Sequence, residues 1–215
     1  MNDADNINIL ELMASKICHD LISPVGAISN GVEILEELGG EADSDITDLI
    51  EFSANQANAK LKTMRLAYGI GGSDASIKTE DVHKIFGEFI SGEARLSQDW
   101  NPHDDLGNQP QKGFPKILML SLLLIIDALP KGGVISVKSG GDNTTIITGK
   151  GENAHFRDEY IHALEHKTPP SKLEPKLIHA YITGLLANNY GFIVEPCEAE
   201  NNFISLRLKA TNVSL

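Results

Sequence analysis

The chain has 215 residues, of which 41% are hydrophobic and 22% are charged, so it can bury a sizeable core in one large domain or two small ones. Its formal net charge of −12 argues against nucleic acid or an anionic membrane as the main partner, because both require a basic patch. It shows no signal peptide and no apolar run long enough to span a bilayer, and its two distant cysteines suit a reducing compartment, so we expect a cytoplasmic protein.

The first predicted helix runs from about residue 6 to residue 38 and carries a heptad pattern. Its apolar or small residues recur at alternating steps of three and four, which is typical of a helix in a bundle seam. They are Ile7, Leu10, Ala14, Ile17, Leu21, Pro24, Ile28, Gly31, Leu35 and Leu38. In this register His19 lies on the face opposite the seam, and Ile22 is exposed close by. Pro24 interrupts the helical hydrogen bonding, and Gly39 and Gly40 are expected to end the helix.

The second predicted helix, from Ile46 to about Ile70, carries two apolar stripes. One stripe contains Ile46, Ile50, Ser53, Ala57, Leu61, Met64 and Tyr68, and the other contains Leu49, Phe52, Gln56, Ala59, Leu66 and Ile70. A single antiparallel partner helix covers only one of them, so a second copy of the hairpin is expected to complete a four-helix bundle. The sequence therefore predicts a homodimer. Packing against the remainder of the chain is the alternative that could absorb part of the second stripe.

A glycine-rich segment, Gly71 to Ser76, separates the helical pattern from a mixed one. We assign residues 1–72 to a helical hairpin, 73–77 to a linker and 78–215 to an α/β domain. Within that domain the pattern predicts helices over 80–91, 114–129, 156–164 and 175–189, and strands over 95–100, 134–137, 144–148, 192–196 and 203–208. The expected fold class is α+β.

The string around the outward histidine resembles the H-box, the phosphoacceptor motif of sensor histidine kinases. It reads His19-Asp20-Leu21-Ile22-Ser23-Pro24-Val25-Gly26-Ala27-Ile28 and continues with Asn30-Gly31-Val32-Glu33. The string is more similar to the ChpT-type histidine phosphotransferases of alphaproteobacteria. This resemblance covers nearly the whole chain from about residue 6. It implies a dimeric four-helix bundle followed by an α/β sandwich like the ATP-binding domain of histidine kinases, of the GHKL group.

The α/β part departs from active ATP-binding domains where nucleotide is held. Leu124 stands where those domains carry a metal-binding asparagine, and Ile147 stands where an aspartate reads adenine, although Gly149 and Gly151 of that motif remain. The loop before Pro175 lacks the glycines of the phosphate-covering lid. Because leucine offers Mg²⁺ no oxygen ligand, we expect no ATP binding and no cofactor bound by this chain. The ChpT-type proteins share this degenerate domain.

The resemblance implies that His19 is the phosphoacceptor. Asp20 can accept a hydrogen bond from one ring nitrogen and so orient or activate the ring. Mg²⁺ is expected on the partner receiver domain, because this chain shows no ligand cluster for it. His162 and His166 are four residues apart, but no acid or thiol completes a site with them, so we predict no bound metal.

Three further residues of the string are candidate contacts with a partner. Ile22 either docks a partner helix or packs on the second helix of its own hairpin. Ser23 stands where histidine kinases carry a residue that helps to position water for dephosphorylation, or it is a solvated serine near the proline. Gly26 either allows a close approach of the partner backbone or serves a bend near Pro24.

The sequence thus predicts a phosphorelay intermediate rather than an ATP-dependent kinase. We expect a histidine phosphotransferase that passes a phosphoryl group between receiver-domain aspartates of a two-component phosphorelay through His19. Its expected partners are a second copy of the chain and the receiver domains of a hybrid histidine kinase and of response regulators. Two alternatives remain, an ATP-dependent histidine kinase core and a non-enzymatic dimeric scaffold that binds response regulators.

Overall fold

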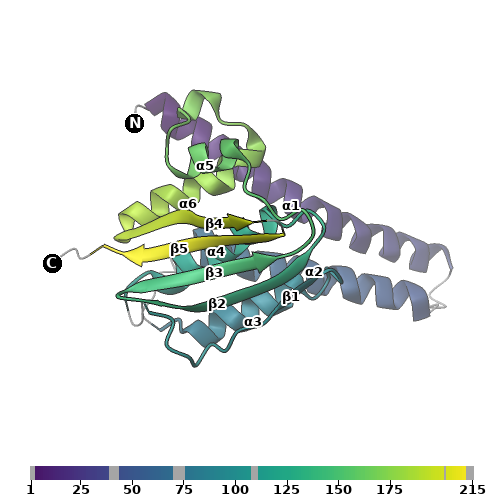
Figure 1. Cartoon of the computed structure of the whole chain (residues 1–215). Coiled ribbons are helices and arrows are strands. Elements are labelled where there is room, and N and C mark those ends of the chain that lie inside the picture. The colour runs from purple at the N-terminus through teal and green to yellow at the C-terminus, as the bar shows by residue number, and fades with distance from the viewer. Residues whose placement is uncertain (1–2, 39–43, 70–75, 108–110, 201, 212–215) are drawn as a thin grey trace.

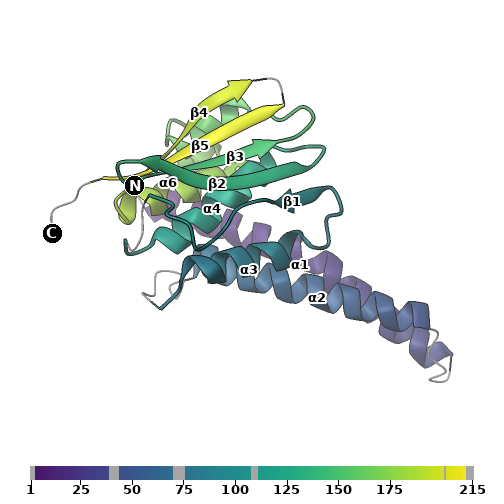
Figure 2. The same ribbon diagram turned by 60° about the horizontal axis from the view of Figure 1, so that its bottom comes forward.

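An antiparallel helical hairpin forms the N-terminal part of the molecule. In the computed structural model, which describes residues 3–38, 44–69, 76–107, 111–200 and 202–211, α1 spans Asp3–Glu37 and α2 spans Ser44–Tyr68. The far end of the hairpin projects well beyond the α/β part (Figure 2). Gly39, Gly40 and residues 73–75 of the predicted linker lie outside the described residues.

The remainder of the chain is built on a five-stranded sheet with strand order β1-β2-β3-β5-β4 (Figure 1). The strands are β1 (Leu96–Gln98), β2 (Gly133–Gly141), β3 (Thr144–Lys150), β4 (Phe192–Glu200) and β5 (Phe203–Ala210). β1 pairs in parallel with β2, and the other pairs are antiparallel. The helices of this part are α3 (Thr79–Ile90), α4 (Phe114–Asp127), α5 (Asp158–Leu164) and α6 (Ile178–Asn189). The α+β fold class is confirmed.

The predicted and observed bounds differ mainly at element ends. The predicted strand over 95–100 shortens to β1, and the predicted helix over 156–164 begins only at Asp158. The predicted helix from Pro175 opens as a 3₁₀ turn, η3 (Pro175–Leu177), before α6; a second such turn, η2 (Pro170–Lys172), precedes it. Proline fixes φ and lacks the N–H, so it suits such a first turn.

Helix α4 lies between the sheet and the hairpin and supplies much of the core. It contacts β3 and β5 on one side and α2, α3 and α6 on the others. A helix with neighbours all round must be apolar all round. Its fully buried side chains include Ile117, Leu118, Met119, Leu120, Leu122 and Ile125.

The heptad seam predicted for α1 is wrong at its N-terminal end. Ile7 and Leu10 are 55% and 69% exposed, whereas Ile9 is buried at 8% and belongs to the core of the α/β part. The reason is the neighbour: this end of α1 packs on η2, η3 and α6, and Asn8 Nδ2 donates to the carbonyl of Pro170 at 2.5 Å. The buried face of α1 at this end is therefore the one that carries Ile9, and not the predicted seam with Ile7 and Leu10. Further along, the seam residues Pro24 and Gly31 are buried as predicted.

The end of α2 is anchored in the same core. Leu66 of the second stripe is 4% exposed and belongs to the core of the α/β part. The C-terminal end of this stripe is therefore buried within the same chain. The Lys116 ammonium is almost completely buried and donates to the carbonyls of Ala67 at 3.1 Å and Gly69 at 2.5 Å. These are carbonyls at the end of α2, which have no helical donor. Burial lowers the pKa of Lys116 to about 8.

At its projecting end the hairpin keeps apolar side chains exposed. Leu49 and Phe52 of the second stripe are 45% and 55% exposed. Leu61 of the first stripe is 52% exposed as well, but it lies near the base of the hairpin, beside Ile85 and Glu88 of α3. On α1, Val25 and Val32 are 50% and 42% exposed. Exposed apolar side chains grouped in this way are typical of surfaces that bind another protein.

Candidate functional site

His19 lies in the middle of α1 and points into solvent. Its side chain is 88% exposed, as the outward position in the helix pattern predicts. Neighbouring Asp20 is only 29% exposed, because it lies on the side of α1 that turns toward α2 and the α/β part. The pair therefore consists of an accessible ring supported by a half-buried carboxylate.

The Asp20 carboxylate is shared between two donors. Nδ1 of His19 lies 3.4 Å from Oδ1, and the Lys16 ammonium lies 3.1 Å from Oδ2. Nδ1 donates to a carboxylate when it carries a proton, and in the neutral tautomer protonated at Nδ1 the other nitrogen, Nε2, keeps its lone pair. In that tautomer Nε2 faces solvent with a free lone pair, as a nucleophile requires, while Lys16 holds the carboxylate in place.

A third donor contacts Asp20, at its backbone carbonyl oxygen. In a regular helix its carbonyl would accept from the N–H of residue 24, but Pro24 has none. The Lys60 ammonium, on α2, donates to this carbonyl at 3.0 Å. Although Pro24 lies inside it, α1 is helical throughout Asp3–Glu37.

The remaining predicted site residues lie on the same helix. Ile22 is 68% exposed, so the alternative that it packs on α2 is wrong. Ser23 is exposed, and Gly26 is half-buried. A Cβ built on Gly26 would meet nothing within 4 Å, so its own fold does not require glycine at this position. His19, Ile22, Ser23 and Gly26 thus lie on or next to one outward strip of α1.

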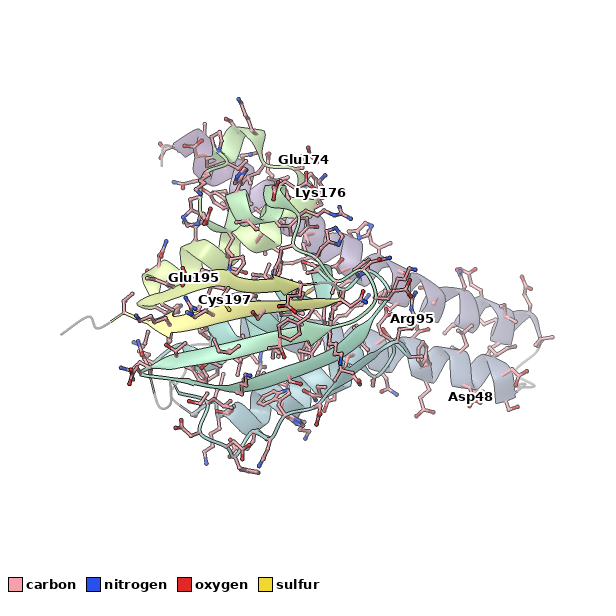
Figure 3. All side chains as sticks on the ribbon, in the orientation of Figure 1. Asp48, Arg95, Glu174, Lys176, Glu195 and Cys197 are labelled. Atoms are coloured by element: carbon pink, nitrogen blue, oxygen red, sulfur yellow. The ribbon has the colours of Figure 1, made fainter. Side chains whose placement is uncertain are left out.

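A groove of about 330 Å³ opens beside Asp20. It lies where the hairpin meets the α/β part, between α1, α2, α3 and the turn around Pro130. Figure 3 shows Arg95 at this junction and Asp48 far out on the projecting end. Lys16, Lys60 and Arg95 face the groove together with the acids Asp20 and Glu93, and its other walls are largely apolar.

The two positions at which the sequence comparison with kinases expects nucleotide contacts, Leu124 and Ile147, are buried in the core. Leu124 is 4% exposed and Ile147 is completely buried in the sheet. The retained glycines have a packing reason: a Cβ on Gly149 would lie 2.7 Å from Ile125 Cγ2, and one on Gly151 would lie 2.0 Å from the carbonyl oxygen of Gly132. Their presence therefore does not require a nucleotide.

Within the described part of the chain, no group of three or more histidine, cysteine or acidic residues is placed to hold a metal ion. His166, which the sequence pairs with His162 at metal-ligand spacing, has its Nε2 3.2 Å from the carbonyl oxygen of Tyr181.

Both cysteines are free, as predicted. Among the described helices, none combines the length and the apolar character needed to cross a membrane.

Two residues of the site were not singled out from the sequence. Lys16 lies four residues before Asp20, and this i,i+4 spacing of opposite charges was a readable signal. Lys60 lies 40 residues after Asp20 on another helix, so only the packing of the hairpin brings the two together.

The comparisons with known proteins show what the chain as a whole is similar to. The family model of the histidine phosphotransferase C-terminal domain matches residues 79–201. The protein phosphotransferase ChpT of Brucella abortus (strain 2308) is 35% identical over 184 residues, covering 84% of this chain and 85% of that protein. A solved structure of a bacterial phosphotransferase shares 29% identity over 97% of this chain and 98% of its own, with a TM-score of 0.76. The histidine kinase AdeS of Acinetobacter baumannii shares the fold, with 11% identity, coverage of 91% and 98%, and a TM-score of 0.50.

Proposed function

Because the chain belongs to the histidine phosphotransferase family and acts in a phosphorelay, we propose that His19 is the residue that carries the phosphoryl group. The observation that carries this proposal is the pairing of an 88% exposed ring with the Asp20 carboxylate at Nδ1. In the neutral tautomer protonated at Nδ1, this arrangement leaves the lone pair of Nε2 open to a partner.

The transfer step requires little of the protein besides orientation. Nε2 of His19 forms a bond to the phosphorus of a receiver aspartyl phosphate, while the P–O bond to the aspartate breaks and that carboxylate leaves. The ring keeps its Nδ1 proton and so becomes positively charged. Asp20, 3.4 Å from Nδ1, stabilises this charge in the way that a carboxylate supports a catalytic imidazole. The reverse steps return the phosphoryl group to another receiver aspartate.

The partner is a receiver domain, and it supplies the Mg²⁺ that the acyl phosphate needs. A receiver that delivers its aspartate to His19 must cover the neighbouring outward strip of α1. Ile22, Ser23 and Gly26 are therefore the contacts that we propose. The exposure of Ile22 and the open space above Gly26 support this docking face.

The working form is a homodimer. The exposed apolar side chains on the projecting part of the hairpin, Val25, Val32, Leu49 and Phe52, support a second hairpin packing there as a four-helix bundle. The site operates without ATP, since buried Leu124 and Ile147 replace the magnesium amide and the adenine-reading carboxylate. The protein works in the cytoplasm, where receiver domains are found.

The experiment is transfer from a receiver domain labelled with radioactive acetyl phosphate. The wild-type chain should gain a label that is labile to acid and stable to base. His19→Ala should gain none, whereas His103→Ala, which removes another exposed imidazole (71% exposed), should be labelled normally. A His19→Ala variant that is still labelled contradicts the assignment. A wild-type chain that binds the receiver without being labelled would favour the scaffold alternative.

A further inference from the structure

The carbonyl oxygen of Asp20 is an acceptor that the helix cannot satisfy by itself. Its normal donor would be the N–H of residue 24, and Pro24 has none. An unpaired backbone carbonyl next to the phosphoacceptor would leave this turn of α1 free to tilt outward. The Lys60 ammonium reaches across from α2 and occupies that acceptor at 3.0 Å.

All three acceptor atoms of Asp20 therefore have different donors. Lys60 takes the backbone oxygen, Lys16 takes Oδ2 at 3.1 Å, and Nδ1 of His19 faces Oδ1 at 3.4 Å. The first two contacts fix the peptide and the carboxylate, and only Oδ1 is left for the ring. His19 itself makes no such contact with α2, so its orientation depends on how firmly Asp20 is held.

We propose that Lys60 is a positioning residue for phosphotransfer: it replaces the helical donor that Pro24 removes, and thereby holds Asp20 where it orients His19. The inference rests on the proposed role of His19. Lys60 does not touch the reacting atoms. Its effect falls on the rate of the chemical step at saturating receiver, because misplacing a reacting group by about 1 Å can slow a reaction by roughly 100-fold.

The test is a set of variants assayed with the acetyl-phosphate-labelled receiver. Lys60→Met keeps the length of the side chain and removes the donor. We expect it to lower the maximal transfer rate by about 10-fold, with an unchanged half-saturating receiver concentration and melting temperature. Lys60→Arg should restore most of the rate. Lys62→Met is the matched control, because it removes a lysine of the same helix whose ammonium pairs with Glu88 instead, at 2.8 Å.

A Pro24→Ala background makes the test specific. Alanine restores the N–H of residue 24, which can donate to the Asp20 carbonyl directly. In that background Lys60→Met should change the maximal rate by less than about twofold, since the acceptor no longer needs the lysine. A 10-fold loss that persists in the alanine background would show that Lys60 acts otherwise and would overturn the inference.

Two other results would also overturn it. If Lys60→Met transfers at the wild-type rate, Lys60 positions nothing. If the variant only raises the half-saturating receiver concentration, Lys60 is a receiver contact on the wall of the groove. Wild-type protein and His19→Ala are labelled in the same experiment. If wild type is labelled and His19→Ala is not, the role of His19 holds, and a negative result for Lys60→Met then counts against this inference alone.

Discussion

The hydroxyl of Tyr68, at the end of α2, lies 2.6 Å from Nδ1 of His179 in α6. The other ring nitrogen, Nε2, lies 3.1 Å from the carbonyl oxygen of Leu120 in α4. Because a carbonyl only accepts, Nε2 must carry the proton, and Nδ1 accepts from the tyrosine. Burial lowers the pKa of His179 to about 3 and raises that of Tyr68, so both groups are neutral in the folded protein. The hairpin and the α/β part are joined by this contact.

We predict that His179 makes the folded protein less stable as the pH falls below 6.5. The unfolded chain binds a proton at His179 near its ordinary pKa of 6.5, whereas the folded chain does so only near 3. Between these values the unfolded state holds more protons, so acid favours unfolding. This residue alone should remove on the order of 2 kcal/mol between pH 7 and pH 5.

The measurement is the free energy of unfolding in urea at both pH values. His179→Asn is the control, because asparagine can accept from Tyr68 and donate to Leu120 but does not titrate. The variant should lose on the order of 2 kcal/mol less than wild type over this interval, whatever its absolute stability. Equal losses in the two proteins would mean that His179 is not held neutral by the fold.

We predict that a charge at Phe52 breaks the proposed dimer. Phe52 is 55% exposed on the projecting end of the hairpin, so Phe52→Glu should leave the single chain folded. In the bundle the carboxylate would be buried without a partner, which costs about 3–5 kcal/mol. Light scattering at micromolar concentration should give the 23.3 kDa monomer for the variant and twice that mass for wild type.

Asn188→Glu, an equal change in charge at an exposed position on α6, should remain dimeric. Ile50, a member of the first predicted stripe, is unsuitable for the same test. Its Cγ1 would lie 2.6 Å from a Cβ on Gly31, so it packs within its own hairpin and a charge there would disturb the monomer as well. A wild-type protein that is monomeric at these concentrations would count decisively against the four-helix bundle.

We predict no magnesium-dependent binding of ATP. Leu124 and Ile147 offer no oxygen to the metal or the adenine, and both are buried in the core. Isothermal calorimetry with ATP and Mg²⁺ should show no heat of binding, while an active histidine kinase ATP-binding domain measured in parallel serves as positive control. A micromolar, magnesium-dependent affinity would reverse this conclusion.

The sequence predicted the folds of both parts because each depends on local patterns. Periodicity gave the helices, and the string from His19 to Ile28 gave the outward histidine, since helix phase alone decides which way residue 19 points. The face of α1 near Ile9 was mispredicted because heptad spacing cannot tell a partner helix from the chain's own α/β part. Lys60 was missed for a related reason: a contact across 40 residues depends on the packing of two helices and leaves no periodic signal.

Gly26 offers the sharpest test of where the receiver docks. It lies seven residues after His19, two helical turns along the same outward strip. A Cβ there would meet nothing within 4 Å in the single chain, so Gly26→Leu should fold, and it should gain about 1 kcal/mol of helix propensity. A receiver that covers the strip would meet the new side chain directly.

Gly26→Leu should therefore weaken receiver binding and slow transfer at limiting receiver, while the melting temperature stays level or rises. His19→Ala should do the reverse, abolishing the label while receiver affinity changes by less than about 1 kcal/mol, because one imidazole contributes little contact area. Gly31→Ala is the matched control: its Cβ would lie 2.6 Å from Ile50 Cγ1, so it should lower the melting temperature by straining the contact between α1 and α2. For the three variants we would measure receiver affinity, transfer rate and melting temperature. Affinity reports docking, the transfer rate reports the chemistry, and the melting temperature reports the packing of α1 on α2. Transfer by Gly26→Leu at the wild-type rate would place the receiver elsewhere on the molecule, even if His19 remains the phosphorylated residue.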